Sequence, residues 1–498
     1  MARIPLLGGS YKQASLIAGA QRCVNLYPEF NTERTQAPTN VTHYSRPGLT
    51  PKGTPPIVGL GRALYATSQG QLLCVINQNV YSIDANFNYT LLGQLVTNIP
   101  SPVGISDNGI TAFLVDGDNT GSQVTLSSLT MSQITDPNFM GSTWTDFLDS
   151  FVVFNEPKSP NWYCTQSNSN VFNALFFGTK TAWPDNIVRV IVNERQAWLF
   201  GQYKGEVWQN AGLAPFPFQL ISGNIIEHGI TGPYCAAKQD INIYWLSESP
   251  EGSRMAMRGA YNTAQRISTH AIEDEWLTYA KVSDCICTIM QIRGHPFVFF
   301  DFPTADRTWV FDDATQEWHE EAYFDNNGVQ HRTKDTFKAY CYGLNLSLDW
   351  NTGQLYQRDE TNYSDNGQQI VYRRGMPHFV DNQNFNRVTL WRIIADMECG
   401  NGTGIVTQDP WSVGFSPGFG PIVYAGPAVI LRVSRDRGFS YNVHSVQTLG
   451  LPGGYATKPT WNRCGIAYDL VVEMEWEGPL HTALNGVFAL TEESYADE

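Results

Sequence analysis

The sequence predicts an all-β protein in which a β-propeller of six to eight blades is followed by a C-terminal β-sandwich domain. Short apolar and aromatic runs alternate at period two and are broken by Gly, Asn and Asp, as in antiparallel strands. A unit of apolar strand, turn and aromatic strand recurs at a spacing of about 35–60 residues. From about residue 369 onward the strands become longer, which indicates a second kind of domain.

The clearest copy of this unit spans residues 187–210. Valines at alternate positions precede the apolar run 197–200, and Gly201 and Gly205 bracket a turn before Val207. Period-two alternation broken by glycine indicates three short antiparallel strands.

The same unit is repeated along the chain. Comparable stretches lie over residues 63–84, 103–126, 144–165, 234–268, 295–320 and 337–358. Radial repetition of four short strands per blade is typical of a propeller. An irregular set of β-sandwiches is the alternative, although sandwiches are not expected to repeat one unit so often.

Three domains follow from this pattern. Residues 1–60 contain many prolines and are predicted to be an irregular segment that packs on the propeller or on a neighbour. Residues 61–368 are predicted to form the propeller, and residues 369–498 the β-sandwich, ending in the acidic tail TEESYADE. One helix is predicted over 270–281, with Ile272, Trp276 and Leu277 on one face.

Composition limits the class of protein. The 498 residues exceed the roughly 250–300 at which a single core stops growing. Only 16% of residues are charged, against an average of about 25%. This fits either a protein that buries surface in stable contacts or a β-protein rich in Thr and Asn. The net charge of −15 argues against a conventional nucleic-acid binder, but it suits a wall along which DNA slides without adhering.

The cysteines and the apolar runs indicate whether the protein depends on disulfides or crosses a membrane. The nine cysteines are scattered and include no C-x-x-C pair, which predicts reduced, buried thiols rather than a disulfide framework. Cys285 and Cys287 are expected on one face of a strand. No stretch approaches the length of a membrane span, and the first residues lack the apolar run of a signal peptide.

Three motifs resemble catalytic or metal sites, and each is interpreted as structural. The stretch 414–418 (GFSPG) matches a nucleophile elbow, but Pro417 has no N–H to donate to an oxyanion. The stretch 116–121 (DGDNTG) resembles a calcium loop without its later Glu, so a hairpin turn is expected. The stretch 318–321 (WHEE) lacks further zinc ligands and is interpreted as an exposed strand end.

A fourth motif, 434–441 (SRDRGFSY), resembles an Asp-box, a hairpin turn in which the Asp side chain accepts backbone N–H groups. Asp-boxes occur in sialidases as structural turns away from the active site. We therefore predict no catalytic residue, no metal ligand and no cofactor. The loop 213–218 (LAPFPF) could contact a neighbouring molecule or pack on its own domain.

Several stretches, taken in order, resemble the packaged DNA stabilisation proteins of short-tailed bacteriophages, also described as tail accessory or nozzle proteins. The first is 23–28 (CVNLYP) followed by 46–49 (RPGL). The second is the strand pair within 187–212 followed by 228–235 (HGITGPYC). The third is LRVSRDRGFSY followed by 461–465 (WNRCG) and alternating strands.

This resemblance implies a non-enzymatic virion protein of the phage tail that is assembled in the host cytoplasm. It implies a nozzle or hub that completes the head, helps to retain packaged DNA and forms part of the conduit for DNA ejection. The implied partners are five further copies in a homo-hexameric ring, portal and adaptor proteins, and a tail needle, fibres or spikes. Double-stranded DNA would pass through the lumen without sequence-specific binding.

Two other functions stay open at this point. A sialidase-like or lectin-like propeller that binds glycans would need paired acids and an arginine cluster on one propeller face. A cytosolic propeller scaffold would have a soluble partner and no association with particles.

Overall fold

The computed structural model describes residues 2–4, 12–30, 41–261, 263–381, 385–401, 428–450 and 452–494. Contacts divide the chain into two compact units. One unit comprises Met1–Thr50, Trp309–His331 and Asp359–Glu498, and the other comprises Pro51–Thr308 and Arg332–Arg358. We call them the sandwich unit and the propeller unit, after the strand arrangements described below.

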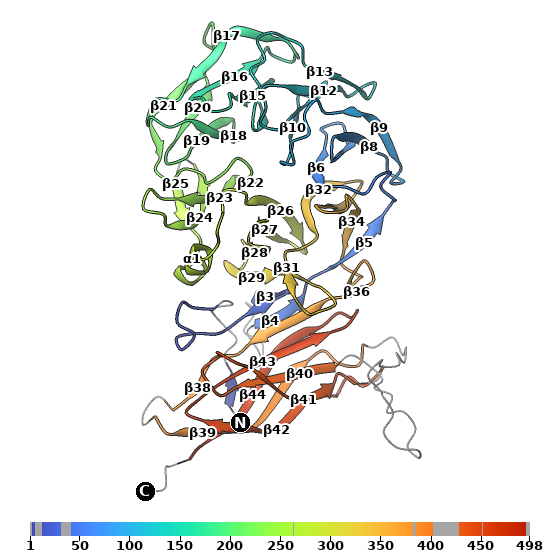
Figure 1. Cartoon of the computed structure of the whole chain (residues 1–498), viewed down its shortest axis with the longest axis vertical. Coiled ribbons are helices and arrows are strands. Elements are labelled where there is room, and N and C mark those ends of the chain that lie inside the picture. The colour runs from blue at the N-terminus through green and yellow to red at the C-terminus, as the bar shows by residue number, and fades with distance from the viewer. Residues whose placement is uncertain are drawn as a thin grey trace. The chain divides into compact units, whose positions relative to one another are not determined.

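The propeller unit contains seven antiparallel sheets that follow one another along the chain and are arranged around a centre (Figure 1). The first four sheets each have four strands: β6 (Gly61–Ala66), β7 (Leu72–Ile76), β8 (Asn79–Ile83) and β9 (Tyr89–Gln94); β10 (Gly104–Asp107), β11 (Thr111–Val115), β12 (Gly121–Thr125) and β13 (Thr130–Gln133); β14 (Thr145–Leu148), β15 (Phe151–Asn155), β16 (Asn161–Thr165) and β17 (Phe172–Thr179); β18 (Ile187–Asn193), β19 (Gln196–Gly201), β20 (Gly205–Asn210) and β21 (Phe218–Ile226).

The remaining three sheets repeat this order. They contain β22 (Ala236–Gln239), β23 (Asn242–Glu248), β24 (Arg254–Ala260) and β25 (Thr263–Arg266); β26 (Ile286–Ile292), β27 (His295–Phe302) and the first residues of β28 (Arg307–Asp312); β32 (Asp335–Cys341), β33 (Leu344–Asp349), β34 (Leu355–Asp359) and the last residues of β5 (Gly48–Lys52). Seven lies within the predicted range of six to eight blades. The prediction of a propeller is confirmed.

Residues 187–210 form the strands that their alternation predicts. In the register of β18 and β19, Val190 lies opposite Leu199, and in that of β19 and β20, Trp198 lies opposite Val207. Strand β19 ends at Gly201 and β20 begins at Gly205, so the predicted turn lies between these two glycines. Local alternation was sufficient here because each strand pairs with its neighbour in sequence.

Hydrophobic cores lie between consecutive sheets of this unit. Leu73 of the first sheet and Leu114 of the second belong to one buried cluster. Phe113 of the second sheet packs edge-on against Phe154 of the third, with ring centroids 5.6 Å apart. Each sheet therefore buries both faces against its neighbours, which stabilises a ring of sheets rather than a pair of sheets.

The last sheet packs against the first and closes the ring. Leu72 of β7 and Leu348 of β33 share a buried cluster. Strand β5, which precedes the first sheet in sequence, lies next to β34 of the last sheet. Gln354 strengthens this closure, because its Nε2 donates to the carbonyl oxygen of Lys52 at 3.3 Å.

The helix α1 (His270–Leu277) confirms the predicted start but ends four residues before the predicted Lys281. Ile272 and Trp276 are buried as expected, whereas Leu277 is 53% exposed and does not share their face. Glu273 takes a buried place instead, because its carboxylate pairs with Arg266. An ion pair therefore replaces part of the expected apolar face.

The sandwich unit contains two stacked layers of strands. One sheet has the order β3 (Leu26–Phe30), β4 (Val41–Ser45), β44 (Ala483–Ser494), β39 (Arg387–Met397) and β42 (Thr460–Ala467), with β1 (Ala2–Ile4) beside β44. The other has the order β29 (Glu317–Glu321), β2 (Cys23–Val24), β37 (Val371–Gly375), β43 (Asp469–Glu477), β40 (Ala428–Ser434) and β41 (Asn442–Thr448), with β38 (Phe379–Val380) beside β43. Two short hairpins complete the unit: β30 (Tyr323–Phe324) with β31 (Gln330–His331), and β35 (Ser364–Asp365) with β36 (Gln368–Gln369).

A single apolar core joins the two layers. Leu390 of β39 and Val487 of β44 belong to the same buried cluster as Leu431 of β40, Val472 of β43 and Trp476 of β43. The prediction of a β-sandwich is confirmed. Strand β44 runs to Ser494, so residues 491–494 of the expected acidic tail are part of a strand, and 495–498 lie outside the described residues.

The segment predicted to be irregular, 1–60, contains five strands, β1 to β5, in its described residues. Pro28 did not prevent pairing, since it lies in β3 opposite His43 of β4. The partners of β1 and β4 come from β44, more than four hundred residues later in the chain, so no local pattern could reveal them. In the same way, residues 309–331 and 359–368 of the expected propeller range cluster with the sandwich unit.

The stretch 318–321 was expected at an exposed strand end, and this expectation is wrong. It lies in β29, where His319 is 1% exposed and Glu321 2%. Parallel pairing of β29 with β2 places Glu320 beside the N-terminal segment, where Arg22 binds it through two hydrogen bonds of 3.0 and 2.7 Å. The charged side chains are buried because they have partners that are remote in sequence.

A buried polar hub joins four segments of the sandwich unit. Arg46 is 2% exposed, and its Nη1 and Nη2 donate to the two carboxylate oxygens of Asp365 at 3.1 and 2.6 Å. Its Nε donates to Oδ1 of Asn25 at 2.8 Å. Asn25 has a positive φ of 61°, accepts the N–H of Ala322 on Oδ1, and donates from Nδ2 to the carbonyl oxygen of Val371. We call Asn25, Arg46 and Asp365 the polar hub.

We predict that Asp365→Ala strongly destabilises the protein. The substitution removes the carboxylate that the buried Arg46 guanidinium binds through two hydrogen bonds, and the Glu321 carboxylate lies 4.0 Å away, so the expected loss is about 3–5 kcal/mol. The free energy of unfolding can be measured by urea denaturation followed by intrinsic fluorescence. Lys458→Ala is the matched control in the same unit, because Lys458 is 63% exposed in its 3.8 Å pair with Asp396, and exposed pairs contribute less than about 1 kcal/mol. Equal stability of the two variants would contradict the role of the hub.

Candidate functional site

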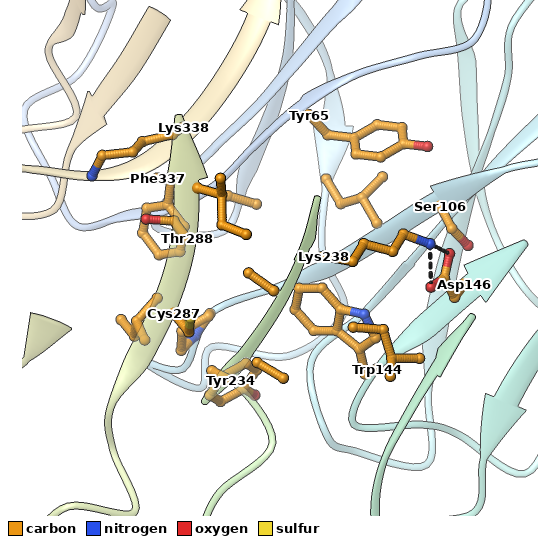
Figure 2. Close-up of a pocket in the computed structure, with 18 of the residues that line it drawn as sticks. Tyr65, Ser106, Trp144, Asp146, Tyr234, Lys238, Cys287, Thr288, Phe337 and Lys338 are labelled. Atoms are coloured by element: carbon orange, nitrogen blue, oxygen red, sulfur yellow. Dashed lines mark hydrogen bonds and ion pairs between the residues drawn. The ribbon is translucent and has the colours of Figure 1, made fainter. Parts of the chain in front are cut away.

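A cavity with a volume of about 410 Å³ lies at the centre of the propeller unit. Its walls come from the first strand of every one of the seven sheets, β6, β10, β14, β18, β22, β26 and β32, and from the residues just before some of them. Figure 2 shows that aromatic, hydroxyl and charged side chains share these walls. A cavity of this size and composition is suited to a small ligand.

One wall carries an ion pair between the first strands of the third and fifth sheets. Nζ of Lys238 on β22 donates to both carboxylate oxygens of Asp146 on β14, at 2.9 and 2.7 Å, as drawn in Figure 2. Lys238 also donates to the carbonyl oxygen of Val192, and Asp146 accepts the N–H of Val192 at 2.7 Å. The carboxylate is therefore fully engaged. The Lys238 side chain is 41% exposed, so this end of the cavity is open to solvent.

Arg189 of β18 is the buried cation of the cavity. It is 3% exposed, and its guanidinium lies over the ring of Trp144, 3.9 Å from the centroid. Nη1 donates to the carbonyl oxygen of Pro233 at 2.9 Å, while Nε has no hydrogen-bond partner among the described residues. Burial lowers the pKa of Arg189 to about 10, which leaves the side chain charged at neutral pH.

A third cation, Lys338 of β32, is turned away from the open end. Its side chain is fully buried, and Nζ donates to the carbonyl oxygen of Asp335 at 2.6 Å while lying 3.9 Å from the ring centroid of Phe299. The carboxylate of Asp335 is held by Arg358 through bonds of 2.7 and 3.1 Å. This cluster fixes the edge of the cavity rather than offering a free group.

The neutral walls have little chemical reactivity. Burial raises the pKa of the Cys287 thiol well above its ordinary value, so this cysteine is a poor nucleophile. Burial and the nearby Asp107 carboxylate also raise the pKa of Tyr65, whose hydroxyl donates to Asp107 at 2.9 Å. The cavity lining contains one carboxylate, Asp146, so it does not present the paired acids that glycoside hydrolysis requires.

The motifs selected from the sequence lie elsewhere and have structural roles. In the stretch 116–121, Asp116 accepts a bond from Nη2 of Arg62 at 3.1 Å, and Gly117 takes a positive φ of 95° between β11 and β12. The expected hairpin turn is present, and its first carboxylate is an ion-pair partner. The described residues contain no cluster of three or more His, Cys, Asp or Glu side chains that could hold a metal ion.

The Asp-box stretch forms the expected turn between β40 and β41. Oδ1 of Asp436 accepts the N–H of Ser440 at 2.9 Å and the hydroxyl of Ser434 at 2.7 Å. The Ser434 hydroxyl oxygen in turn accepts the N–H of Gly438, which has a positive φ of 91°. The GFSPG stretch at 414–418 lies outside the described residues.

The loop 213–218 packs partly on its own unit. Phe216 lies with its ring centroid 5.0 Å from Trp162, and Phe218 is 3% exposed in β21. Leu213, in contrast, is 51% exposed. All nine cysteines are free and buried, which confirms the prediction made from their spacing, and no helix of the described residues has the length or hydropathy to cross a membrane.

Sequence reasoning did not single out the central cavity, because seven segments that are far apart in the chain contribute to it. Arg189 lies within the apolar stretch 187–193 of the sequence. A single cation among valines and isoleucines is unusual there. That pattern was the one available signal. It could not show whether the arginine faces solvent or the centre of a ring.

Comparisons with known proteins identify one family and several distantly similar structures. The family model described as "Bacteriophage P22 Gp10, beta-propeller" matches residues 2–361. Among solved structures, a streptogramin B lyase has 8% identity and a TM-score of 0.40, covering 62% of this chain and 96% of its own. The computationally designed Ika8 protein has 11% identity and a TM-score of 0.37, covering 63% of this chain and 99% of its own. The search of curated proteins found no match.

We predict that the Asp436 turn stabilises the protein at neutral pH and loses this effect in acid. Hydrogen bonds from Ser440 and Ser434 lower the pKa of Asp436 to about 2, below the value of about 3.9 in an unfolded chain. A lowered folded-state pKa gives stability that is present above about pH 4 and lost as the pH falls towards 2. The melting temperature of Asp436→Ala should therefore lie below that of the wild type at pH 6, and the difference should shrink as the pH approaches 2.

Calorimetric melts at a series of pH values measure this difference. Asp274→Ala is the control, because Asp274 is exposed on α1 and its side chain accepts no hydrogen bond from the described part of the chain. A gap between wild type and Asp436→Ala that stays constant from pH 6 to acid would show that the carboxylate bonds do not cause it.

Proposed function

We propose that this protein is the nozzle or hub protein of a short phage tail. The family model matches more than half of the chain, so the chain belongs to the phage DNA-stabilisation family of the P22 Gp10 β-propeller. In this role it extends the portal channel, completes the head, helps to retain packaged DNA and forms part of the exit conduit. The observation that carries the proposal is the family match over residues 2–361.

The closed ring of sheets supports a mechanical role. Each sheet of the propeller unit buries apolar side chains against the next, and β5 closes the last sheet onto the first. Such a ring has few free strand edges and resists deformation, since a packed core does not deform continuously. A rigid unit of this kind suits a channel that withstands the pressure of packaged DNA.

Surface composition supports assembly with other proteins. The chain has only 16% charged residues, and the outermost strands of several sheets carry exposed apolar side chains: Leu91 of β9, Leu175 and Phe177 of β17, and Ile225 of β21. Figure 1 shows these strands at the periphery of the propeller unit. Apolar side chains on peripheral strands are suited to contacts between proteins. We propose that the chain forms a homo-hexameric ring that contacts portal or adaptor proteins and a needle, fibres or spikes.

The net charge suits contact with DNA in transit. At −15, the chain repels phosphates on average, so DNA can pass a lumen formed by this protein without adhering. The mechanism is mechanical and electrostatic, and it requires no catalytic residue. The central cavity agrees with a structural role, because its single carboxylate is held by Lys238 and its cysteine thiol is a poor nucleophile.

The proposal predicts the phenotype of phage particles that lack this protein. Heads should package DNA to the normal extent and then lose it, and no tail extension should be visible. Electron microscopy together with nuclease protection of the packaged DNA measures both effects, with the gene supplied on a plasmid as the control. Stable, full heads with complete tails would contradict the proposal, and hydrolysis of a fluorogenic sialoside would then test the glycan alternative.

A further inference from the structure

The cavity at the centre of the propeller unit has an excess of positive charge inside an acidic protein. Its lining contains three cations, Arg189, Lys238 and Lys338, against one carboxylate, Asp146, while the chain as a whole carries −15. The carboxylate of Asp146 accepts hydrogen bonds from Lys238. Lys338 points away from the cavity and donates to the carbonyl oxygen of Asp335. Arg189 is therefore the cation that faces the cavity without a carboxylate partner.

The residues around Arg189 satisfy only part of the hydrogen-bonding capacity and charge of its guanidinium. The described residues form no ion pair with Arg189, and Nε has no hydrogen-bond partner at 3% exposure of the residue. One backbone oxygen, that of Pro233, and the face of Trp144 are what it contacts. Stacking on an aromatic face stabilises a cation less than burial without a paired anion destabilises it. An anion in the cavity would supply the missing acceptor.

The neighbouring groups cannot supply this negative charge themselves. Cys287 and Cys235 are buried near Arg189, and burial holds the pKa of Cys287 well above its ordinary value, so its thiol stays neutral. The pKa of Tyr234 is also raised by burial. Asp146 interacts electrostatically with Arg189 but is already bonded to Lys238, so no carboxylate of the lining is left to pair with Arg189 alone.

We infer that the central cavity of the propeller unit is a binding site for a small organic carboxylate, whose oxygens pair with Arg189 and whose apolar part contacts the aromatic walls. The planar guanidinium matches a carboxylate through two parallel hydrogen bonds. Tyr65, Trp144, Tyr234 and Phe337 provide apolar surface around it, as Figure 2 shows.

The size and polarity of the cavity select the class of ligand. A volume of about 410 Å³ accommodates a small molecule but not a strand of nucleic acid. One unpaired cation balances a monoanion better than a phosphate of higher charge. Ser106, Thr145 and Thr288 also line the walls, and their hydroxyl oxygens can accept hydrogen bonds from polar substituents of the ligand.

This site is separate from the proposed role in the tail, since it is enclosed by one propeller unit and requires no second copy. Its test therefore uses the purified full-length chain and does not depend on particle assembly. A negative result there leaves the proposed tail function standing, and a failed particle assay leaves the cavity site standing.

Sodium benzoate is the first probe, with sodium acetate as the smaller carboxylate and sodium chloride as the salt control at equal ionic strength. Isothermal titration calorimetry should show saturable binding of benzoate, tighter than that of acetate. Arg189→Met, which keeps the length of the side chain and removes its charge, should weaken benzoate binding at least about tenfold. Arg195→Met is the matched control, because the Arg195 side chain is 80% exposed, and it should bind as the wild type does.

Absence of saturable benzoate binding to the wild-type protein would overturn the inference, as would equal binding by Arg189→Met. If Arg189→Met fails to fold, crystals of the wild-type protein soaked in 4-iodobenzoate give an independent answer. Anomalous iodine signal within the cavity beside Trp144 supports the site. Iodine signal only elsewhere, or none, overturns it.

Discussion

The sandwich unit depends on one buried interaction, the pairing of Arg46 with Asp365. A guanidinium at 2% exposure is tolerated only where charge and hydrogen bonds are supplied to it, and Asp365 and Asn25 supply both. The side chain of Asn25 also accepts the N–H of Ala322 and donates to Val371. Three residues therefore hold together segments that lie more than three hundred positions apart in the chain. The short stretches that carry the family resemblance, CVNLYP and RPGL, contribute two members of this hub.

The propeller unit follows a different principle, in which stability comes from repeated apolar layers. Strands pair with their sequence neighbours, and each resulting sheet is covered on both faces by the next sheets of the ring. Polar groups are then needed mainly at turns and at the centre. The centre is where the layers leave space, because seven first strands converge there and their side chains do not fill it. Arg189, Lys238 and Asp146 lie at this point, where a fold of mainly apolar layers exposes polar groups to a cavity.

The burial of charged residues is the feature that local sequence patterns reveal least. Glu320 and Glu321 resemble a solvated strand end, yet both are buried, because arginines from the first fifty residues pair with them. Glu273, in the first turn of α1, is buried against Arg266. A carboxylate shows in its own sequence context neither whether it is buried nor which cation neutralises it. Asp436 is the contrasting case, because its partners Ser434 and Ser440 are local and the turn was predicted correctly.

The sequence by itself determined the all-β class, the repeated blades, the sandwich and the phage family, because these depend on strand alternation and on motifs within short stretches. The three strands within 187–210 are the clearest example, since each pairs with its neighbour. Only the tertiary structure decided that β1 to β4 form near the start of the chain, that β5 closes the ring, and that Arg189 faces a cavity. The physical reason is the same in each case. The partners of β1, β5 and Arg189 are distant in sequence, so the energy that orders them comes from contacts that no local pattern contains.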